Sequence, residues 1–432
     1  MFQRRKKNRQ RVVLVTRGDV FPPNHGAAVK IVRTAEAMTR LGADVWLVSN
    51  DPARYVRILD RGCEEVAYPK KIATKYTPNE KRLKEIMRRL EIPDADAFMY
   101  MPTFDPHFWL RASYVVHKIK ADAVQAEFPG YAIPATIAAA ARRGCRTTLA
   151  EHNVEYLRIA DSSQISETAQ RNLKALEMLA CAAVQDVIVC SKPDGKRLAD
   201  AGISSNRIHF IPHGVDIENY DNLDKAAARK RLGIPTDAFV IVYHGVLHYG
   251  PNKEAVEIIV DEIMPRMKAR GVEAFFLCVG GNPPRQNAGG FDALFTGAVE
   301  SMPQVLSAAD AAVVPLLGGG GTRLKILEYF AAKLPCVSTA KGAEGIPIKD
   351  GAEILIRDDW DSMADAVAEL KNNRRRTEEI ASAAYRFVQG YSWTSIAQQH
   401  LELYQKPAPP FYRRGLSVKT ILQALRDLIA SA

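Results

Sequence analysis

The chain has 432 residues, of which 47% are hydrophobic and 25% are charged, and its 59 Lys and Arg against 49 Asp and Glu give a formal net charge of +10. This is the composition of an ordinary globular protein, and the longest small apolar stretch, at 131–141, is too short to span a bilayer, which excludes a membrane-embedded chain. One hydrophobic core seldom serves so long a chain, so we expect two domains.

Predicted strands and helices alternate through the first half of the chain. After a basic segment at 1–10, an apolar run predicts a strand at 12–16, helical spacing predicts a helix at 27–41, and a second strand follows at 45–49. Further strands are predicted at 123–128, 147–150, 187–190 and 208–211. Such alternation is typical of a parallel sheet with helices on both faces.

Two places at the ends of these strands are candidates for ligand binding, because open parallel sheets bind ligands at the carboxyl ends of their strands. The loop after the first strand contains Asn24, His25 and Gly26, and the glycine frees backbone amides at the following helix for an anion or an acceptor. His152 lies at the exit of the strand at 147–150 and is expected to face a cleft. Taken alone, the loop also fits a structural turn, and a lone histidine also fits a structural residue.

The second half repeats this plan after a polar joint at 216–238. A helix is predicted from Lys253, and strands are predicted at 239–244, 274–279, 311–315 and 336–339. The chain therefore predicts an α/β protein with two doubly wound parallel-sheet, Rossmann-like domains that face a cleft.

The segment 318–330 carries the most chemical information in the chain. Four glycines follow an apolar strand, and helical spacing then predicts a helix at 322–333. Glycines let the backbone approach an anion, and the free amides at a helix start point toward it. Arg323 and Lys325 add positive charge, and Glu328 can accept hydrogen bonds from sugar hydroxyls. This order predicts a site for a diphosphate that carries a ribose, whereas a surface loop with a Lys–Glu pair is the plainer alternative.

Several segments of the chain resemble family-4 glycosyltransferases of the GT-B fold. They are HNVE at 152–155, IPHGVD at 211–216, HGVLHYGPNK at 244–253, GTRLKILEYFAAKLPCVST at 321–339 and GAEGI at 342–346. The resemblance covers residues 11–405 in outline and is strongest in the second half. It implies an acceptor-side domain at 11–220, a nucleotide-sugar-binding domain at 221–391 and a C-terminal helix at 392–406 that crosses back to the first domain.

The resemblance also implies roles for individual residues. The donor would be bound by Gly320, Gly321, Thr322, Arg323, Lys325, Glu328, Gly245 and Lys253. His152 would contact the transferred sugar or the acceptor, while Arg323 and Lys325 would stabilise the departing diphosphate. The loop with Asn24, His25 and Gly26 would lie near the donor phosphates and the acceptor. The reaction would retain the anomeric configuration, and it would need no metal and no cofactor besides the nucleoside-diphosphate sugar as co-substrate.

Two positions depart from the pattern of the family. Many members place an arginine in the loop that ends at Lys253, and this chain has none there, which makes Arg323 and Lys325 the stronger candidates for the diphosphate charge. The family often has two glutamates separated by seven residues, of which the second corresponds to Glu328 and the first position is Gly320. The identity of the sugar therefore cannot be inferred from contacts of that missing carboxylate.

The predicted function is that of a glycosyltransferase of the hexosyltransferase type, which moves a sugar to a glycan or a lipid-linked acceptor in polysaccharide biosynthesis. Two other classes remain open. A nucleotide-sugar epimerase with the same two-domain plan would need acid and base groups across the sugar, and only His152 is an evident candidate. A non-catalytic nucleic-acid or partner-binding protein would explain the net charge, but the basic runs lack interleaved aromatic residues, which argues against nucleic acid.

Two patterns with weak metal-binding potential complete the candidate sites. His244 and His248 are four residues apart but fall on a strand and a turn, and Asp94 and Asp96 fall in a predicted Pro-containing loop. We therefore expect no metal site.

The cysteines and the chain ends bear on location. Six scattered cysteines indicate reduced thiols in a cytoplasmic protein without a secretory signal, and the basic ends would allow peripheral attachment to an anionic membrane surface at its inner face. Residues 407–432 predict a linker and an amphipathic helix, expected first to dock on the protein body, with a second subunit or a membrane as alternatives. Its apolar stripe is Leu416, Ile421, Leu422, Leu425, Leu428 and Ile429.

Overall fold

The computed structural model describes residues 9–18, 20–23, 25–75, 79–140, 142, 144–162, 164–319, 324–406 and 417–431. The chain forms two compact units: Met1–Pro212 with Ile396–Ala432 is unit 1, and His213–Ser395 is unit 2. The chain passes from unit 1 to unit 2 after Pro212, whereas the domain boundary predicted from the sequence lies at residue 220.

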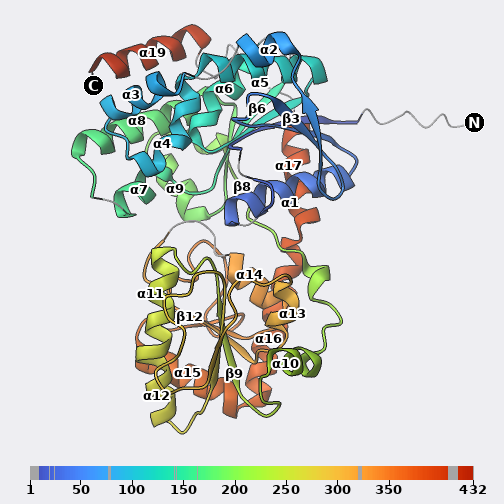
Figure 1. Ribbon diagram of the computed structural model, residues 1–432, viewed down its shortest axis with the longest axis vertical. Helices are drawn as coiled ribbons and strands as arrows, with labels where there is room; N and C mark the ends of the chain where they lie inside the picture. Colours follow the sequence, from blue (N-terminus) through green and yellow to red (C-terminus); the bar gives the residue numbers. More distant parts are fainter. Residues whose placement is uncertain are drawn as a thin grey trace, which may run out of the picture. The chain divides into compact units, whose positions relative to one another are not determined.

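Unit 1 is built on an eight-stranded sheet with the order β4-β3-β2-β1-β5-β6-β7-β8 (Figure 1). Its parallel strands are β1 (Arg11–Val15), β2 (Asp44–Val48), β5 (Ala123–Glu127), β6 (Arg146–Glu151), β7 (Asp186–Val189) and β8 (Ile208–Phe210). The apolar residues of β1 are at most 1% exposed because helices cover both faces of the sheet. An antiparallel hairpin that was not predicted, β3 (Arg54–Ile58) and β4 (Cys63–Ala67), extends the sheet beyond β2.

The helices of unit 1 connect these strands and cover the sheet. They are α1 (Gly26–Arg40), α2 (Lys70–Lys75), α3 (Glu80–Arg89), α4 (Asp94–Tyr100), α5 (Pro106–Ile119), α6 (Ala132–Ala140), α7 (Glu155–Ser162), α8 (Glu167–Ala183), α9 (Lys192–Asp200) and α19 (Val418–Ser431). The prediction of a loop at Asp94 and Asp96 was wrong, since both carboxylates belong to the first turn of α4, where they are favoured by the helix dipole. Helix α17 (Trp393–Gln405) begins in unit 2 and continues into unit 1.

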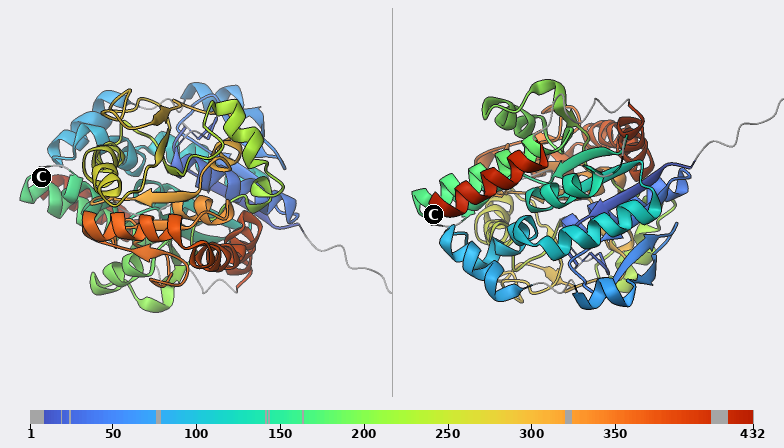
Figure 2. Two further views of the ribbon diagram at one scale, coloured as in Figure 1. Left: turned by 90° about the horizontal axis from the view of Figure 1, so that it is seen from below. Right: turned by 90° about the horizontal axis from the view of Figure 1, so that it is seen from above.

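The C-terminal helix α19 packs on unit 1. It contacts α6 and α8, and Figure 2 shows it in red beside them. Two residues of the predicted apolar stripe, Ile421 and Leu425, are buried at 0% and 5% exposure, whereas Leu416 lies outside the described residues. The apolar face of α19 is therefore directed at the body of the protein. Within the described part of the chain, every helix is too short or too polar to cross a bilayer.

Unit 2 has a fully parallel six-stranded sheet with the order β11-β10-β9-β12-β13-β14. Its strands are β9 (Val240–His244), β10 (Phe275–Val279), β11 (Ala293–Phe295), β12 (Ala311–Val314), β13 (Cys336–Ser338) and β14 (Leu355–Ile356). The helices are α10 (Lys225–Leu232), α11 (Gly250–Ile258), α12 (Met264–Ala269), α13 (Met302–Leu306), α14 (Leu324–Ala331), α15 (Trp360–Asn372) and α16 (Arg374–Val388), and a short 3-10 helix, η4, spans Ile217–Tyr220. In Figure 1, α11 and α12 lie on one side of the sheet and α14 and α16 on the other.

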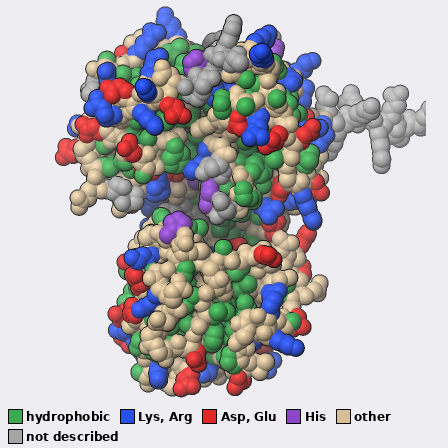
Figure 3. Space-filling view, viewed as in Figure 1, with side chains coloured by type: hydrophobic (Ala, Val, Ile, Leu, Met, Phe, Trp, Pro, Cys, Tyr) green, Lys and Arg blue, Asp and Glu red, His purple; other side chains and the backbone are tan. Residues whose placement is uncertain are grey.

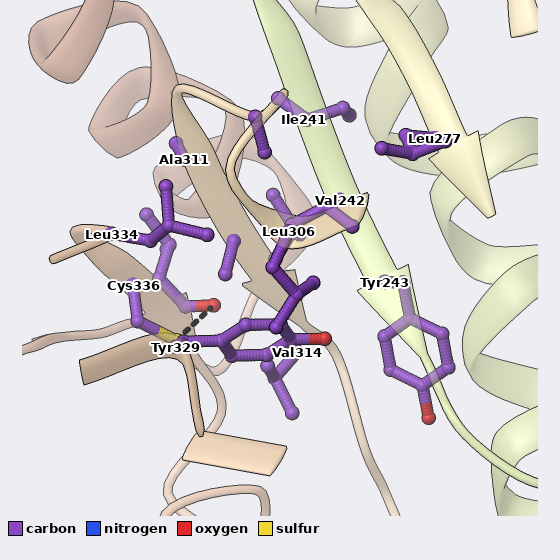
Figure 4. Close-up of a cluster of buried hydrophobic side chains, with 14 of the residues drawn as sticks. Ile241, Val242, Tyr243, Leu277, Leu306, Ala311, Val314, Tyr329, Leu334 and Cys336 are labelled. Carbon is purple, nitrogen blue, oxygen red and sulfur yellow. Dashed lines mark hydrogen bonds between the residues drawn. The ribbon is translucent and has the colours of Figure 1, made fainter. Parts of the chain in front are cut away.

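Helix α14 is anchored to the sheet of unit 2 by its apolar face. Figure 4 shows Tyr329 of α14 among buried side chains from the strands, including Val314 and Cys336, while Tyr243 lies near the end of β9. With this packing, Lys325 and Glu328 of α14 lie beside Tyr243 and His244 at the carboxyl end of β9. On the surface that Figure 3 shows, basic and acidic side chains are interspersed. Ion pairs among the described residues include Arg270 with Asp361 at 3.0 Å.

Candidate functional site

Three glycine-containing turns meet at the carboxyl edge of the sheet in unit 2. The N–H of Gly245 donates to the carbonyl oxygen of Val279 at 3.0 Å, and the N–H of Gly280 donates to the carbonyl oxygen of Gly297 at 3.0 Å. A Cβ atom on Gly280 would lie only 2.0 Å from the carbonyl oxygen of Gly245. The turns after β9, β10 and β11 therefore pack backbone against backbone, which only glycine permits at residue 280.

Lys325 projects from α14 into a polar cluster beside β9. Its Nζ donates to the Tyr243 hydroxyl at 2.7 Å and to Asn252 Oδ1 at 2.8 Å, and it lies 4.0 Å from the centroid of the Tyr243 ring. The Tyr243 hydroxyl in turn donates to Asn252 Oδ1 at 2.7 Å. These two partners are neutral, and a ring face attracts a cation, so they hold the ammonium group in place without cancelling its charge.

Gly245 makes room for this cluster. A Cβ atom at residue 245 would lie 2.9 Å from Asn252 Nδ2 and 3.2 Å from Lys325 Nζ. Both distances are shorter than ordinary contacts, so a larger residue would displace the amide or the ammonium group. Gly245, which was predicted to bind the sugar donor, thus leaves the space that the ammonium group of Lys325 occupies.

Glu328 lies one turn after Lys325 on α14 and faces two side chains of unit 2. Its Oε2 lies 3.3 Å from His244 Nε2, and its Oε1 accepts a hydrogen bond from the Tyr220 hydroxyl at 3.4 Å. The Glu328 side chain is 30% exposed, whereas the His244 side chain is 8% exposed. The carboxylate therefore has protein partners on one side and solvent on the other.

The electrostatics of this pair follow from desolvation. Burial raises the pKa of Glu328 to about 7, although the Tyr220 hydrogen bond and the charge of Lys325 oppose this rise. Burial, with a smaller effect of Lys325, lowers the pKa of His244 to about 3. The imidazole is accordingly neutral at physiological pH, and Glu328 changes its charge near neutral pH.

His152 in unit 1 belongs to a buried network. It follows β6 directly, is 5% exposed, and its Nε2 lies 2.8 Å from Glu127 Oε2 at the end of β5. Glu127 also accepts a hydrogen bond from Lys30 Nζ at 2.7 Å, and the His152 ring stacks on Phe128 with centroids 4.4 Å apart. Although burial opposes ionisation of Glu127, Lys30 and His152 lower its pKa to about 2, while burial lowers the pKa of His152. The ring is thus fixed in position and in plane.

The loop after β1 supplies a helix cap. His25 is the N-cap of α1, and its Nδ1 accepts a hydrogen bond from the N–H of Ala28 at 3.3 Å. Gly26 is the first residue of α1, and Asn24 lies outside the described residues. The geometry accounts for His25 as a capping residue.

Comparisons with known proteins decide the family. The model of "Glycosyl transferases group 1" matches residues 238–373, and that of "Glycosyltransferase Family 4" matches residues 25–219. The chain belongs to the family-4 glycosyltransferases.

A D-inositol 3-phosphate glycosyltransferase from Nocardia farcinica is 27% identical over 224 residues, which cover 47% of this chain and 48% of that protein. A phosphatidyl-myo-inositol mannosyltransferase from Mycobacterium leprae is 24% identical over 207 residues, which cover 46% and 53%. This family-4 chain thus spans about half the length of the curated relatives that it matches.

Solved structures resemble more than nine tenths of this chain. Sucrose-phosphate synthase from Thermosynechococcus elongatus has a TM-score of 0.65 at 18% identity and covers 92% of this chain and 99% of its own. The Anabaena protein HepE, solved in complex with UDP, has a TM-score of 0.61 at 17% identity and covers 91% and 99%. These likenesses show the predicted GT-B fold.

The predicted donor residues of this family-4 member are only partly described. Gly245, Lys325 and Glu328 come together at the edge of the unit 2 sheet. Lys253 is 55% exposed and its Nζ lies 3.9 Å from Glu257 one turn along α11, so it belongs to the surface of that helix. Gly320, Gly321, Thr322 and Arg323 lie outside the described residues. Among the described residues, no group of three or more His, Cys, Asp and Glu is arranged to hold a metal ion.

Sequence reasoning missed several residues of these clusters: Tyr220, Tyr243, Asn252, Lys30 and Glu127. The sequence suggests that Tyr243 is a core residue because it lies in an apolar strand, and that Lys30 is a surface residue of a helix. Polar residues inside buried strands could have revealed these clusters. His244 ends β9, and Gln125 and Glu127 lie in β5, where their polar atoms need hydrogen-bond partners from the protein instead of water.

Proposed function

We propose that this protein is a glycosyltransferase that transfers a hexosyl group from a nucleoside-diphosphate sugar to a hydroxyl group of a glycan or a lipid-linked acceptor. The observation that carries the proposal is the pairing of Lys325 and Glu328 at one edge of the unit 2 sheet. A cation suits a diphosphate, and a half-buried carboxylate suits the hydroxyls of a ribose. The UDP complex of HepE and the transferase names of the relatives support this assignment.

The residues of unit 2 would act on the leaving group. When the bond between the anomeric carbon and the diphosphate breaks, the diphosphate keeps the electron pair and gains negative charge. Lys325, held by Tyr243 and Asn252, would stabilise that charge without further reorganisation, and Arg323 with the backbone amides near residue 322 would add to it. The acceptor oxygen would bond to the anomeric carbon and pass its proton to the departing diphosphate, which has gained negative charge. We propose a retaining reaction without a metal.

His152 of unit 1 would act on the transferred sugar or on the acceptor, and not on the diphosphate. Glu127 and Phe128 fix its ring, and we propose that it contacts the transferred sugar or the acceptor. The backbone around Gly26 at the start of α1 would lie near the same substrates. We further propose a cytoplasmic location, in keeping with scattered cysteines of which five are buried. We also propose peripheral attachment to the inner face of a membrane where the acceptor is lipid-linked.

A binding and turnover experiment tests this proposal. The wild-type protein is screened by thermal shift against UDP, GDP and ADP and their common sugar conjugates, because a ligand of the folded state raises the melting temperature. The conjugate with the largest shift is then incubated with and without glycan acceptors, and nucleotide release and product are measured by chromatography. We expect nucleotide release that depends on the acceptor. Lys325→Ala and Glu328→Ala should each reduce this release about ten- to a thousandfold. Conversion of the sugar without an acceptor would instead indicate an epimerase, and unchanged release in both variants would refute the site.

A further inference from the structure

The carboxylate of Glu328 is flanked by two side chains that come from separate elements of unit 2. His244 ends strand β9, and Tyr220 ends the 3-10 helix η4, which precedes the strand in the chain. Each side chain addresses a different oxygen of the carboxylate: His244 Nε2 lies 3.3 Å from Oε2, and the Tyr220 hydroxyl donates to Oε1 at 3.4 Å. Each oxygen of the carboxylate therefore has one polar side chain beside it.

His244 is itself held firmly in place. Its backbone N–H donates to the Tyr329 hydroxyl at 3.0 Å, and its ring meets the Tyr329 ring edge to face, with centroids 5.0 Å apart. The residue is 6% exposed in a strand whose other members are fully buried. Within the described residues, its Nε2 has no well-aligned hydrogen-bond partner, although Glu328 is close. A polar atom in such surroundings costs free energy unless a partner completes its hydrogen bond, so its direction toward Glu328 calls for an explanation beyond packing.

We infer that His244 and Tyr220 are positioning residues that set the Glu328 carboxylate to accept both hydroxyls of a ribose, so that unit 2 selects ribonucleotides over deoxyribonucleotides. This inference rests on the proposed function, because it assumes that Glu328 binds the ribose of the donor. The carboxylate keeps 30% of its side chain exposed, and each oxygen retains lone pairs beyond the one that faces its protein partner. Two adjacent hydroxyl groups match two carboxylate oxygens, whereas a deoxyribose leaves one half-buried oxygen without its donor.

The selectivity should depend on both partners. Without the Tyr220 hydroxyl or the His244 ring nitrogen, the carboxylate can turn about its side-chain bonds toward water, and the hydroxyls then meet an unprepared acceptor. In that case both hydrogen bonds to the ribose are lost together, whereas Lys325 stays held by Tyr243 and Asn252 and would still bind the diphosphate. The variants should therefore weaken binding of ribonucleotides more than binding of their deoxy analogues.

The test compares three nucleotides on four proteins by isothermal titration calorimetry. The nucleotides are UDP, 2′-deoxy-UDP and 3′-deoxy-UDP, or the matching guanine or adenine set if that base binds more tightly. The proteins are the wild type, Tyr220→Phe, His244→Phe and the control Tyr385→Phe, which removes a hydroxyl that bonds Asp221 at 3.2 Å on the surface of the same unit. His244→Phe keeps an aromatic ring against Tyr329, and melting curves check that each variant folds.

The wild type and the control should prefer the ribonucleotide by about ten- to a hundredfold, the range of a lost buried hydrogen bond. In Tyr220→Phe and His244→Phe this ratio should fall to within about threefold, mainly through weaker binding of the ribonucleotide. If His244→Phe does not fold, Tyr220→Phe alone decides. Equal losses for ribo- and deoxyribonucleotides, or an unchanged ratio, would overturn the inference and leave the proposed function intact. Failure of the wild type to bind any nucleotide would overturn the proposed function first.

Discussion

The Glu328 carboxylate should destabilise the unliganded protein, and its replacement by glutamine should show this. Burial raises the pKa of Glu328 to about 7 from the ordinary 4.5 of an unfolded chain. Between these values the unfolded protein has lost its proton while the folded protein keeps it. The stability of the wild type therefore falls as the pH rises through this interval and levels off above pH 7. Glu328→Gln removes this dependence because an amide does not ionise.

The size of the effect follows from the pKa difference. Each pKa unit corresponds to about 1.4 kcal/mol, so an interval of roughly 2.5 units sets an upper limit near 3 kcal/mol. The side chain is 30% exposed, and water screens part of the cost, so we expect about 1–2 kcal/mol at pH 8.5. For a unit of this size, that gain raises the melting temperature by about 3–6 °C.

The assay follows thermal and urea unfolding of the wild type and Glu328→Gln from pH 4.5 to 8.5 without ligand. Glu257→Gln is the matched control, because Glu257 lies on an exposed face of α11 with 48% of its side chain in solvent. The advantage of Glu328→Gln should grow between pH 4.5 and 7 and then remain constant, while the same variant loses nucleotide affinity. A variant no more stable than the wild type at pH 8.5 would refute the reasoning, since the carboxylate would then not be desolvated in the folded chain.

Three further variants test the clusters. Gly245→Ala should weaken nucleotide binding about tenfold, because the added Cβ displaces the ammonium group of Lys325. The control Gly390→Ala should bind as the wild type does, because its Cβ meets open space. Equal nucleotide affinity of the two variants would contradict the packing argument. Lys325→Met should lower turnover about a hundredfold, whereas the exposed Lys230→Met should not, and similar rates would remove the cation from the mechanism. Glu127→Ala should lower the free energy of unfolding of unit 1, measured in urea, by about 3–5 kcal/mol, because the buried Lys30 loses its counter-charge. A loss below about 1 kcal/mol would show that the network of Lys30, Glu127 and His152 does not stabilise the fold.

The predictable part of the fold was set by local patterns. Continuous apolar runs such as 12–15 mark strands buried on both faces, and helical spacing marks the segment around Leu324–Ala331. The hairpin β3–β4 and the short strands β11 and β14 escaped prediction. In the hairpin, charged residues interrupt the apolar ones, as in RYVRI and CEEVA, so neither strand forms a continuous apolar run. Strands β11 and β14 have three and two residues, too few for a period to be visible.

For the candidate site, the sequence by itself determined that Lys325 and Glu328 lie one turn apart on a helix that follows a strand, since spacing along a helix is a local property. Only the tertiary structure decided which groups face them. Tyr220 reaches Glu328 across 108 positions of the chain, and Asn252 reaches Lys325 across 73. Periodicity states which face of an element is buried but not which distant side chain meets it there, because that depends on how the strands order themselves and on how closely glycine turns let their ends approach.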